Sequence, residues 1–204
     1  MLIVDGHPAL GASIAQQLGD QPDMTVLGVC ASAGDAIARA RRVELDVVVC
    51  DYYLPGEDGL SLVVALKQLV RPPAALVHSA YACPEMTVAA LLAGAKGILR
   101  KAASAEAVCV TIRAIADGGT VILPLPASAM LALGARLDGG DARLCGMLID
   151  GVPRYEIAAR LGISHEWIDA RCWAILAQLR FTLRRSRSLL DWGGYGSMRP
   201  RRIA

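Results

Sequence analysis

The sequence predicts an α/β fold for its first half, a doubly wound five-stranded parallel sheet, followed by a small all-α domain. Short apolar runs alternate five times with segments of helical period, and this repeated βα pattern implies a parallel sheet with helices on both faces. Right-handed crossovers between successive strands make such a sheet doubly wound. No convincing strand follows Leu125, so the second half is expected to be helical.

Each expected strand is a short apolar run, and each expected helix has apolar residues at helical spacing. The strands are expected at 2–5, 25–30, 46–51, 74–79 and 97–99. The helices that alternate with them are expected at 8–18, 34–42, 60–70, 85–93 and 104–117. Gly118 and Gly119 then end the fifth helix.

Three short helices are expected after the sheet, at 141–149, 154–161 and 165–180. Gly162 permits a left-handed turn between the last two, and the hydroxyl of Ser164 can cap the helix that follows. Together these features predict the tight two-helix corner of a helix-turn-helix.

A joint between two domains is expected at 121–137, where Pro124, Pro126 and a run of small residues interrupt the helical pattern. It separates a first domain at 1–120 from a helix-turn-helix domain at 138–184, with a basic, flexible tail at 185–204. Residues 1–124 carry a net charge of −3 and residues 125–204 a net charge of +5, with the basic excess in the tail. The two halves are therefore expected to meet different partners.

The composition indicates a cytoplasmic chain with no membrane span. With 204 residues and 54% hydrophobic content, the chain is long enough to bury two cores. Its six cysteines form no Cys-x-x-Cys pair, and no leader sequence precedes the first strand, which favours a reducing compartment. Charged residues or glycines interrupt every apolar run well before about 18 residues, the length needed to cross a bilayer.

Asp51 ends the apolar run 46–51 and is followed by a sharp loop, at the position where open parallel sheets bind ligands. Asp5, Ser79 and Lys101 lie at the expected ends of three other strands. Taken singly, an aspartate at a strand end often only caps a loop, and a lysine near a sheet edge is usually solvated. Their convergence favours one acidic pocket over coincidence.

At this point the whole chain resembles a response regulator of the NarL/FixJ type, a phosphorylatable receiver domain joined to a LuxR-type helix-turn-helix. The resemblance rests on Asp5-x-His7-Pro8 after an apolar strand, on Asp51 with Leu54-Pro55-Gly56-x-Asp58-Gly59, on Ser79-Ala80, and on the run 94–101 that ends in Lys101. In the second half it rests on 156–164. It implies a CheY-like receiver fold.

The resemblance implies a role for each pocket residue. Asp51 would be the phospho-acceptor, attacking a phosphohistidine on a partner histidine kinase. Asp5, Asp51 and a backbone carbonyl near Tyr53 would hold Mg²⁺, which prefers oxygen ligands and keeps several waters. Ser79 would donate a hydrogen bond to one phosphoryl oxygen, and Lys101 would pair with another.

The resemblance also implies a transcription regulator that binds double-stranded DNA as a homodimer, since such domains read paired half-sites. RNA polymerase is a further candidate partner. The residues expected to face DNA are Ser164, His165, Trp167, Arg171 and Gln178.

Three departures from the family pattern qualify these expectations. Gly6 stands where the family usually has a second acidic residue, which predicts weaker Mg²⁺ binding and slow or absent phosphorylation. Ile98 replaces a switching aromatic residue, and Tyr81 could take that role or be a partly buried structural tyrosine. Asp169 replaces a lysine of the recognition helix, so that it repels phosphate instead of attracting it.

A second function remains open. The chain could be a phosphorylation-independent regulator or interaction module, whose receiver senses a partner or ligand and whose altered helix binds DNA weakly or not at all. An enzymatic role is not expected, because His7, His78 and His165 lie in different segments and no catalytic or metal-ligand spacing is present.

Overall fold

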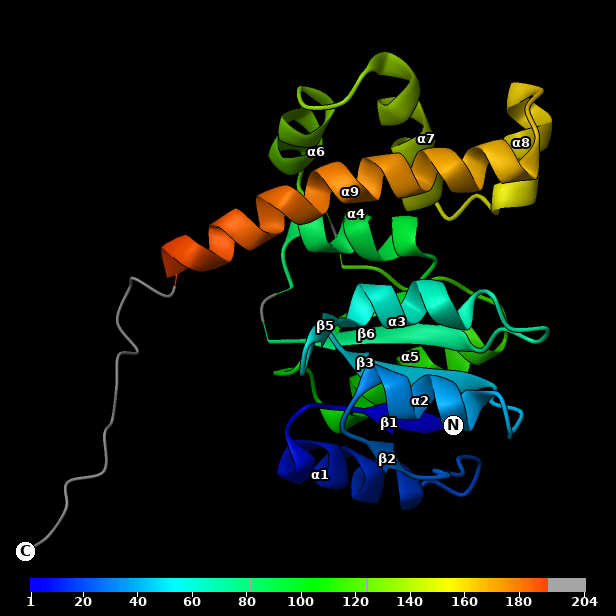
Figure 1. Ribbon diagram of the computed structural model, residues 1–204, viewed down its shortest axis with the longest axis vertical. Helices are drawn as coiled ribbons and strands as arrows, with labels where there is room; N and C mark the ends of the chain where they lie inside the picture. The colour runs from blue at the N-terminus through cyan, green and yellow to red at the C-terminus, as the bar shows by residue number, and fades with distance from the viewer. Residues whose placement is uncertain (81, 124, 191–204) are drawn as a thin grey trace, which may run out of the picture.

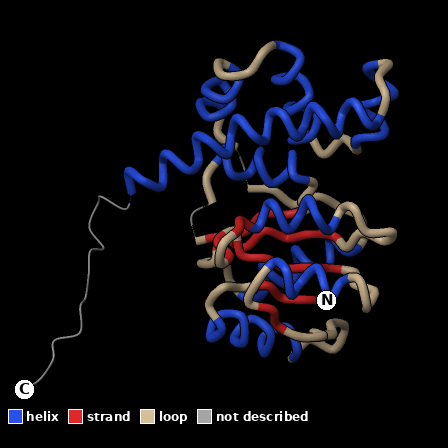
Figure 2. The backbone as a smooth tube through the Cα atoms, viewed as in Figure 1, coloured by secondary structure: helices blue, strands red, loops and turns tan. Residues whose placement is uncertain are grey.

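The computed structural model describes residues 1–80, 82–123 and 125–190, with the backbone alone for 181–190. A five-stranded parallel sheet of order β2-β1-β3-β6-β7 lies between two layers of helices (Figures 1 and 2). Its strands are β1 Leu2–Val4, β2 Val29–Cys30, β3 Val47–Asp51, β6 Ala74–Ser79 and β7 Gly97–Arg100. The predicted doubly wound sheet is confirmed.

The helices cover the two faces of this sheet unequally. Helices α1 Pro8–Gly19 and α5 Ala105–Ala116 pack against one face, and the other is covered by α2 Ala33–Ala40, α3 Gly59–Leu66 and α4 Pro84–Ala93. Successive residues of each strand contribute to opposite cores, because side chains alternate across a strand. Ile3 and Val49 therefore face α1 and α5, while Val4 and Val48 face the other layer.

The loop after Asp51 contains a short hairpin that the sequence did not predict, β4 Tyr53–Leu54 paired with β5 Glu57–Asp58. Gly56 supplies its turn with φ of +77°. Gly59 then lies so close to the end of β3 that a Cβ atom there would be 2.2 Å from the carbonyl oxygen of Asp51. The loop therefore folds back against Asp51, and only a glycine fits at position 59.

The second half is helical, as expected, but two of its boundaries differ. Helix α6 Ala127–Gly134 lies inside the segment 121–137 predicted as a linker, because Pro126 can precede a helix and the residues after it are good helix formers. Helices α7 Gly139–Ile149 and α8 Arg154–Leu161 follow. Helix α9 runs from His165 to Leu190, beyond the predicted end near 180, because no glycine or proline interrupts it. Residues 185–190, the first part of the predicted tail, thus continue α9.

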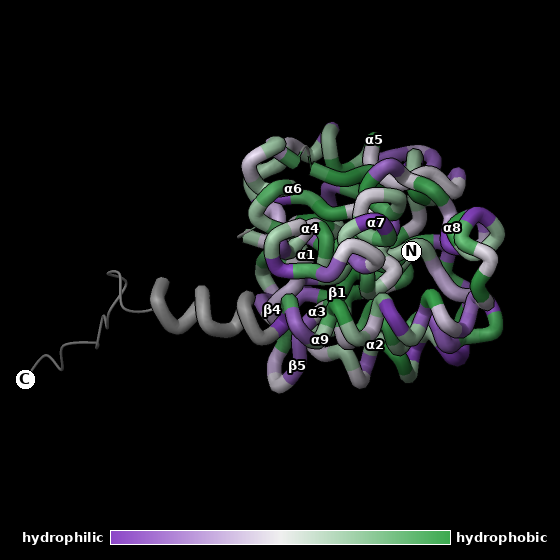
Figure 3. The backbone as a smooth tube through the Cα atoms, turned by 90° about the horizontal axis from the view of Figure 1, so that it is seen from above, coloured by the Kyte–Doolittle hydropathy of each residue, from purple (hydrophilic) through white to green (hydrophobic). Residues whose placement is uncertain are grey.

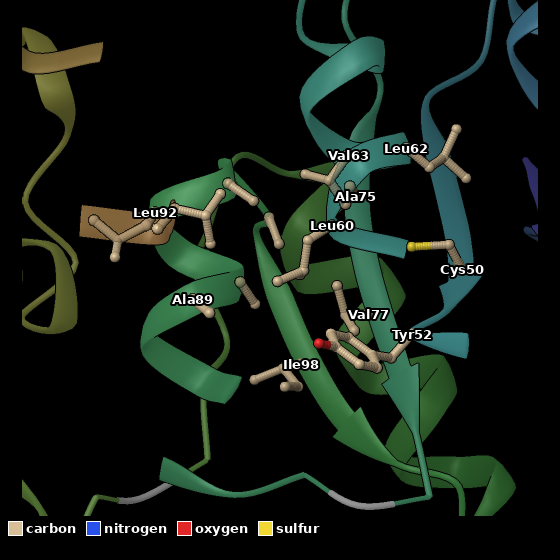
Figure 4. Close-up of a cluster of buried hydrophobic side chains, with 14 of the residues drawn as sticks. Cys50, Tyr52, Leu60, Leu62, Val63, Ala75, Val77, Ala89, Leu92 and Ile98 are labelled. Carbon is tan, nitrogen blue, oxygen red and sulfur yellow. The ribbon is translucent and has the colours of Figure 1, made fainter. Parts of the chain in front are cut away.

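Two other predictions fall outside the described residues: the switching role of Tyr81 and the tail at 191–204. Ile98, which stands where the family usually has the switching aromatic residue, is 1% exposed and packs beneath α4 (Figure 4). It therefore lies in the core.

Helix α4 is buried on all sides and joins the two halves. Every residue from Met86 to Ala93 is buried, because the sheet covers one side of α4 and α7 and α9 cover the other (Figure 1). In the view from above, α4 overlaps with α6 and α7 (Figure 3). In Figure 4, Leu92 points from α4 toward α9. A single cluster of buried residues therefore runs from the sheet into the C-terminal helices. Although α4 is apolar, it is ten residues long, and no described helix has both the length and the apolar character to cross a membrane.

Candidate functional site

Asp5, Asp51 and Lys101 meet at the carboxyl edge of the sheet. Asp51 ends β3, while Asp5 and Lys101 each follow the last residue of a strand, so the parallel order brings all three together. The Nζ atom of Lys101 lies 2.7 Å from Oδ2 of Asp5 and 2.8 Å from Oδ2 of Asp51. Both aspartates are at most 3% exposed, so one ammonium group bridges two buried carboxylates.

The second oxygen of each carboxylate accepts a backbone hydrogen bond. The amide of His7 donates to Asp5 Oδ1 at 2.8 Å, and the amide of Tyr53 donates to Asp51 Oδ1 at 3.1 Å. Each aspartate thus fixes the chain two residues beyond it, a local pattern typical of Asx turns. The carboxylate orientations are set before any ligand binds.

Electrostatics favour the charged form of Lys101. Burial alone would lower its pKa, but hydrogen bonds and charges from Asp5 and Asp51 outweigh this effect, so the pKa of Lys101 is raised. Two carboxylates and one ammonium leave a net negative charge in the pocket. That surplus suits a divalent cation.

Ser79 lies at the same edge but is held through its backbone. It ends β6, is fully buried, and its carbonyl oxygen accepts a hydrogen bond from the amide of Lys101 at 2.9 Å. The ends of β6 and β7 are therefore tied together beside Asp51.

Oxygen donors suited to Mg²⁺ surround this point. The carboxylates of Asp5 and Asp51 are hard ligands, and the carbonyl oxygen of Tyr53 lies 3.3 Å from where a Cβ atom on Gly6 would stand. Ligand atoms of Asp5, His7 and Asp51 lie within 4.8 Å of one another. His7, which the sequence reasoning did not assign, offers an imidazole nitrogen, a ligand better suited to a transition metal than to Mg²⁺. Its position two residues after Asp5 was the available signal.

His78 is a second residue that the sequence reasoning left without a role. It pairs in register with Asp51 and is 4% exposed, and neither of its ring nitrogens has a hydrogen-bond partner of good geometry. Burial, followed by the charge of Lys101, lowers the pKa of His78. The neutral imidazole is thus the favoured form behind the acidic pocket.

The predicted helix-turn-helix is formed by α8 and α9. Gly162 caps α8 in the left-handed conformation with φ of +67°, and the amide of Trp167 donates to Oγ of Ser164 at 3.1 Å. Ile157 and Ile168 are fully buried between the two helices. Both the turn and the cap follow the sequence expectation.

Asp169 of α9 is bound by cations from both halves of the chain. Lys67, which follows α3, donates to Asp169 Oδ1 at 3.1 Å, and Arg154 of α8 donates to the same oxygen. Arg154 also donates to the carbonyl oxygens of Leu91 and Leu92 in α4, at 3.2 and 2.7 Å. Burial would raise the pKa of Asp169, but the charges of Arg154 and Lys67 lower it.

A second polar contact anchors α9 further along. The guanidinium of Arg180 donates to Oδ1 of Asp58 at 2.8 Å and to Oγ of Ser61 at 3.0 Å. Asp58 caps α3, whose first residues follow the loop after Asp51. Helix α9 is therefore fixed at two separate points to residues at the two ends of α3.

The residues predicted to face DNA differ in their availability. Arg171 is engaged: its guanidinium donates to Asp138 at 2.6 Å and to both oxygens of buried Asp141, which ties α9 to the start of α7. A role for Arg171 in base contact stays a prediction that competes with this pairing. The other four side chains are exposed: Ser164, His165, Trp167 and Gln178.

Residues 1–113 match the family model described as the response regulator receiver domain. The chain belongs to the response regulator family. This response regulator is 30% identical over 179 residues to the transcriptional regulatory protein UhpA of Salmonella typhimurium, covering 87% of this chain and 89% of UhpA. It is 27% identical over 192 residues to the DNA-binding transcriptional activator DevR/DosR of Mycobacterium tuberculosis, covering 88% and 87% of the two chains.

Solved structures agree with this assignment. The crystal structure of a LuxR-family two-component response regulator from Aurantimonas sp. SI85-9A1 is 26% identical and has a TM-score of 0.58, covering 60% of this chain and 88% of that one. The predicted fold class and the predicted NarL/FixJ-type family are both confirmed.

In this response regulator, a carboxylate at position 6 would lie beside the proposed Mg²⁺ site. Replacing Gly6 by Asp is expected to tighten Mg²⁺ binding about tenfold, because a third carboxylate adds about 1.4 kcal/mol of attraction at this edge. Gly6→Ala is the matched control, since its Cβ atom meets Pro55 at the same 3.0 Å but brings no charge. Calorimetric titration with Mg²⁺ checks this; equal affinity in Gly6→Asp and Gly6→Ala would contradict it.

Replacing Lys101 by Met is expected to lower the free energy of unfolding at pH 7 by about 2 kcal/mol, because two buried carboxylates lose their shared counter-ion. The folded-state pKa of Lys101 is raised above its ordinary value of 10.5, so its stabilising effect is fully present below pH 10.5 and is lost as the pH rises through the raised value. Urea unfolding of both proteins between pH 7 and 11 should show the difference shrinking only at the alkaline end. A constant difference over that range would rule out the ion pair as its cause.

Proposed function

We propose that this chain is a transcription regulator in which phosphorylation of Asp51 by a histidine kinase controls access of α9 to double-stranded DNA. In this proposal the receiver occupies residues 1–120 and the helix-turn-helix residues 138–184. The observation that carries the proposal is the contact of Asp169 with Lys67, since it holds the DNA-reading helix against the receiver.

The acidic pocket supports the phosphorylation step. A carboxylate oxygen of Asp51 attacks the phosphorus atom; an oxygen–phosphorus bond forms and the nitrogen–phosphorus bond of the phosphohistidine breaks, its electron pair staying on the histidine nitrogen. Mg²⁺, held by Asp5, Asp51 and the Tyr53 carbonyl, would neutralise charge on the transferred group. The ammonium group of Lys101 already lies 2.8 Å from Asp51. It would therefore be within reach of an oxygen of a phosphoryl group on that side chain. The hydroxyl of Ser79 would donate to another.

The junction supports control of α9. A lysine is usual in the family where Asp169 stands, and here the carboxylate serves a contact that DNA binding would have to break. Asp169 on free α9 would repel phosphate, whereas Lys67 and Arg154 neutralise it in the packed arrangement. The packed arrangement is thus the DNA-free form of the regulator.

Two released copies, paired as a homodimer, would read two half-sites, and promoter-bound dimers would be placed to contact RNA polymerase.

The test is duplex binding by the full chain, with and without a small phosphodonor and Mg²⁺. The phosphodonor is expected to raise the affinity of wild type roughly tenfold or more and to leave Asp51→Ala unchanged. Lys67→Gln is expected to raise the affinity without phosphodonor, although it removes a positive charge, because it frees α9 from the receiver side.

The matched control for a general charge effect is Arg42→Gln, an exposed basic residue in the loop after α2. Duplex affinity that falls equally in Lys67→Gln and Arg42→Gln would refute the junction as a restraint. A wild-type response that persists in Asp51→Ala would refute Asp51 as the acceptor.

A further inference from the structure

A pocket of about 310 Å³ lies where the receiver meets the helix-turn-helix, a volume within the range of small-molecule sites. The receiver lines it with residues after α3, at the end of α4, before β7 and after α5. The second half lines it with the turn between α7 and α8 and with the first residue of α9. The polar side chains among them belong to Lys67, Lys96, Thr120, Arg154, Tyr155 and His165.

The pocket has a surplus of positive charge. Lys67, Lys96 and Arg154 line it, and no aspartate or glutamate is among the lining residues. Asp169 pairs with Lys67 and Arg154 just beyond the wall, and its second oxygen lies 3.5 Å from Nδ1 of His165. One carboxylate therefore balances one of three permanent cations.

Lys96 is the cation without a counter-ion. Within the part of the chain that the structure describes, its ammonium group makes no ion pair, and its amide is committed to the carbonyl oxygen of Ala75. Burial, followed by the charge of Arg154, lowers the pKa of Lys67 even though Asp169 is its partner. An anion in the pocket would give Lys96 a counter-ion and would offset the repulsion between Arg154 and Lys67.

The start of α8 adds to this field. Pro153, Arg154 and Tyr155 line the pocket, and they are the N-cap and first two residues of that helix. Proline offers no side chain to cap the first amides, and Glu156, the acidic residue of the first turn, pairs instead with Arg160. Cationic side chains and this helix terminus therefore act on the same volume.

We propose that this junction pocket binds a small, freely diffusing anion with at least two negative charges, of phosphate or pyrophosphate chemistry. Because both halves line the pocket, the anion binds only while α9 is packed on α4. By linkage it stabilises that arrangement and opposes release of the DNA-reading helix. The regulator thus has a second input that is separate from Asp51.

Binding is tested by calorimetric titration of the full chain with pyrophosphate at constant ionic strength. Wild type is expected to give saturable binding, and Lys96→Gln to weaken it roughly tenfold, the loss of one charge-assisted contact. Lys96 lies outside the acidic pocket and has no ion pair to break, so the variant should fold. Arg42→Gln makes the same charge change at a residue that does not line the pocket, and it is expected to bind pyrophosphate as wild type does. No saturable binding, or equal losses in the two variants, would overturn the proposal; this titration needs neither DNA binding nor phosphorylation.

The regulatory consequence has its own test. Pyrophosphate is expected to weaken duplex binding by wild type more than by Lys96→Gln at the same concentration, because only the intact pocket favours the packed arrangement. An equal loss in both proteins would mean that pyrophosphate competes directly with DNA phosphates, and would overturn the coupling.

Discussion

Helix α4 has no polar face, and the arrangement of the whole molecule depends on covering it. A helix that is apolar all round must be buried on all sides, and the sheet can cover only one of them. Helices α7 and α9 cover the other, and Arg154 adds hydrogen bonds to the carbonyl oxygens near the end of α4. Releasing α9 would expose this apolar surface, so packing favours the closed arrangement, and in the proposed mechanism phosphorylation has to supply the energy to leave it.

The path from the acidic pocket to α4 is short. Ser79, the predicted phosphoryl partner, ends β6, and α4 begins five residues later at Pro84. Asp58 and Ser61, which hold Arg180 of α9, follow the loop that leaves Asp51. A phosphoryl group on Asp51 would therefore act on segments that lead directly to both anchors of α9. Gly59, packed against the Asp51 carbonyl, leaves that loop little freedom to absorb the change.

Much of the pocket could be predicted from the sequence because it depends on strand ends. Asp5 and Asp51 each directly follow an apolar run, and Lys101 follows one with Arg100 between. A parallel sheet places such positions at one edge. The charge-free run from Met86 to Ala93 also signals a helix buried on both sides. The pairing of Arg171 with Asp138 and Asp141 could not be predicted, since those residues are about thirty positions away and meet only through tertiary packing. The same limit applies to Lys67 and Asp169, whose contact spans the two halves.

Hydrogen exchange of the full chain tests the central claim most directly, because α4 and the start of α9 should open together. With Mg²⁺ and a phosphodonor, amides of α4 and of the first turns of α9 are predicted to exchange faster in wild type and at an unchanged rate in Asp51→Ala. Mass measurement on the same samples shows whether a phosphoryl group is present, and its absence from Asp51→Ala assigns it to Asp51. A fully phosphorylated protein whose α4 and α9 keep their original protection would contradict the account.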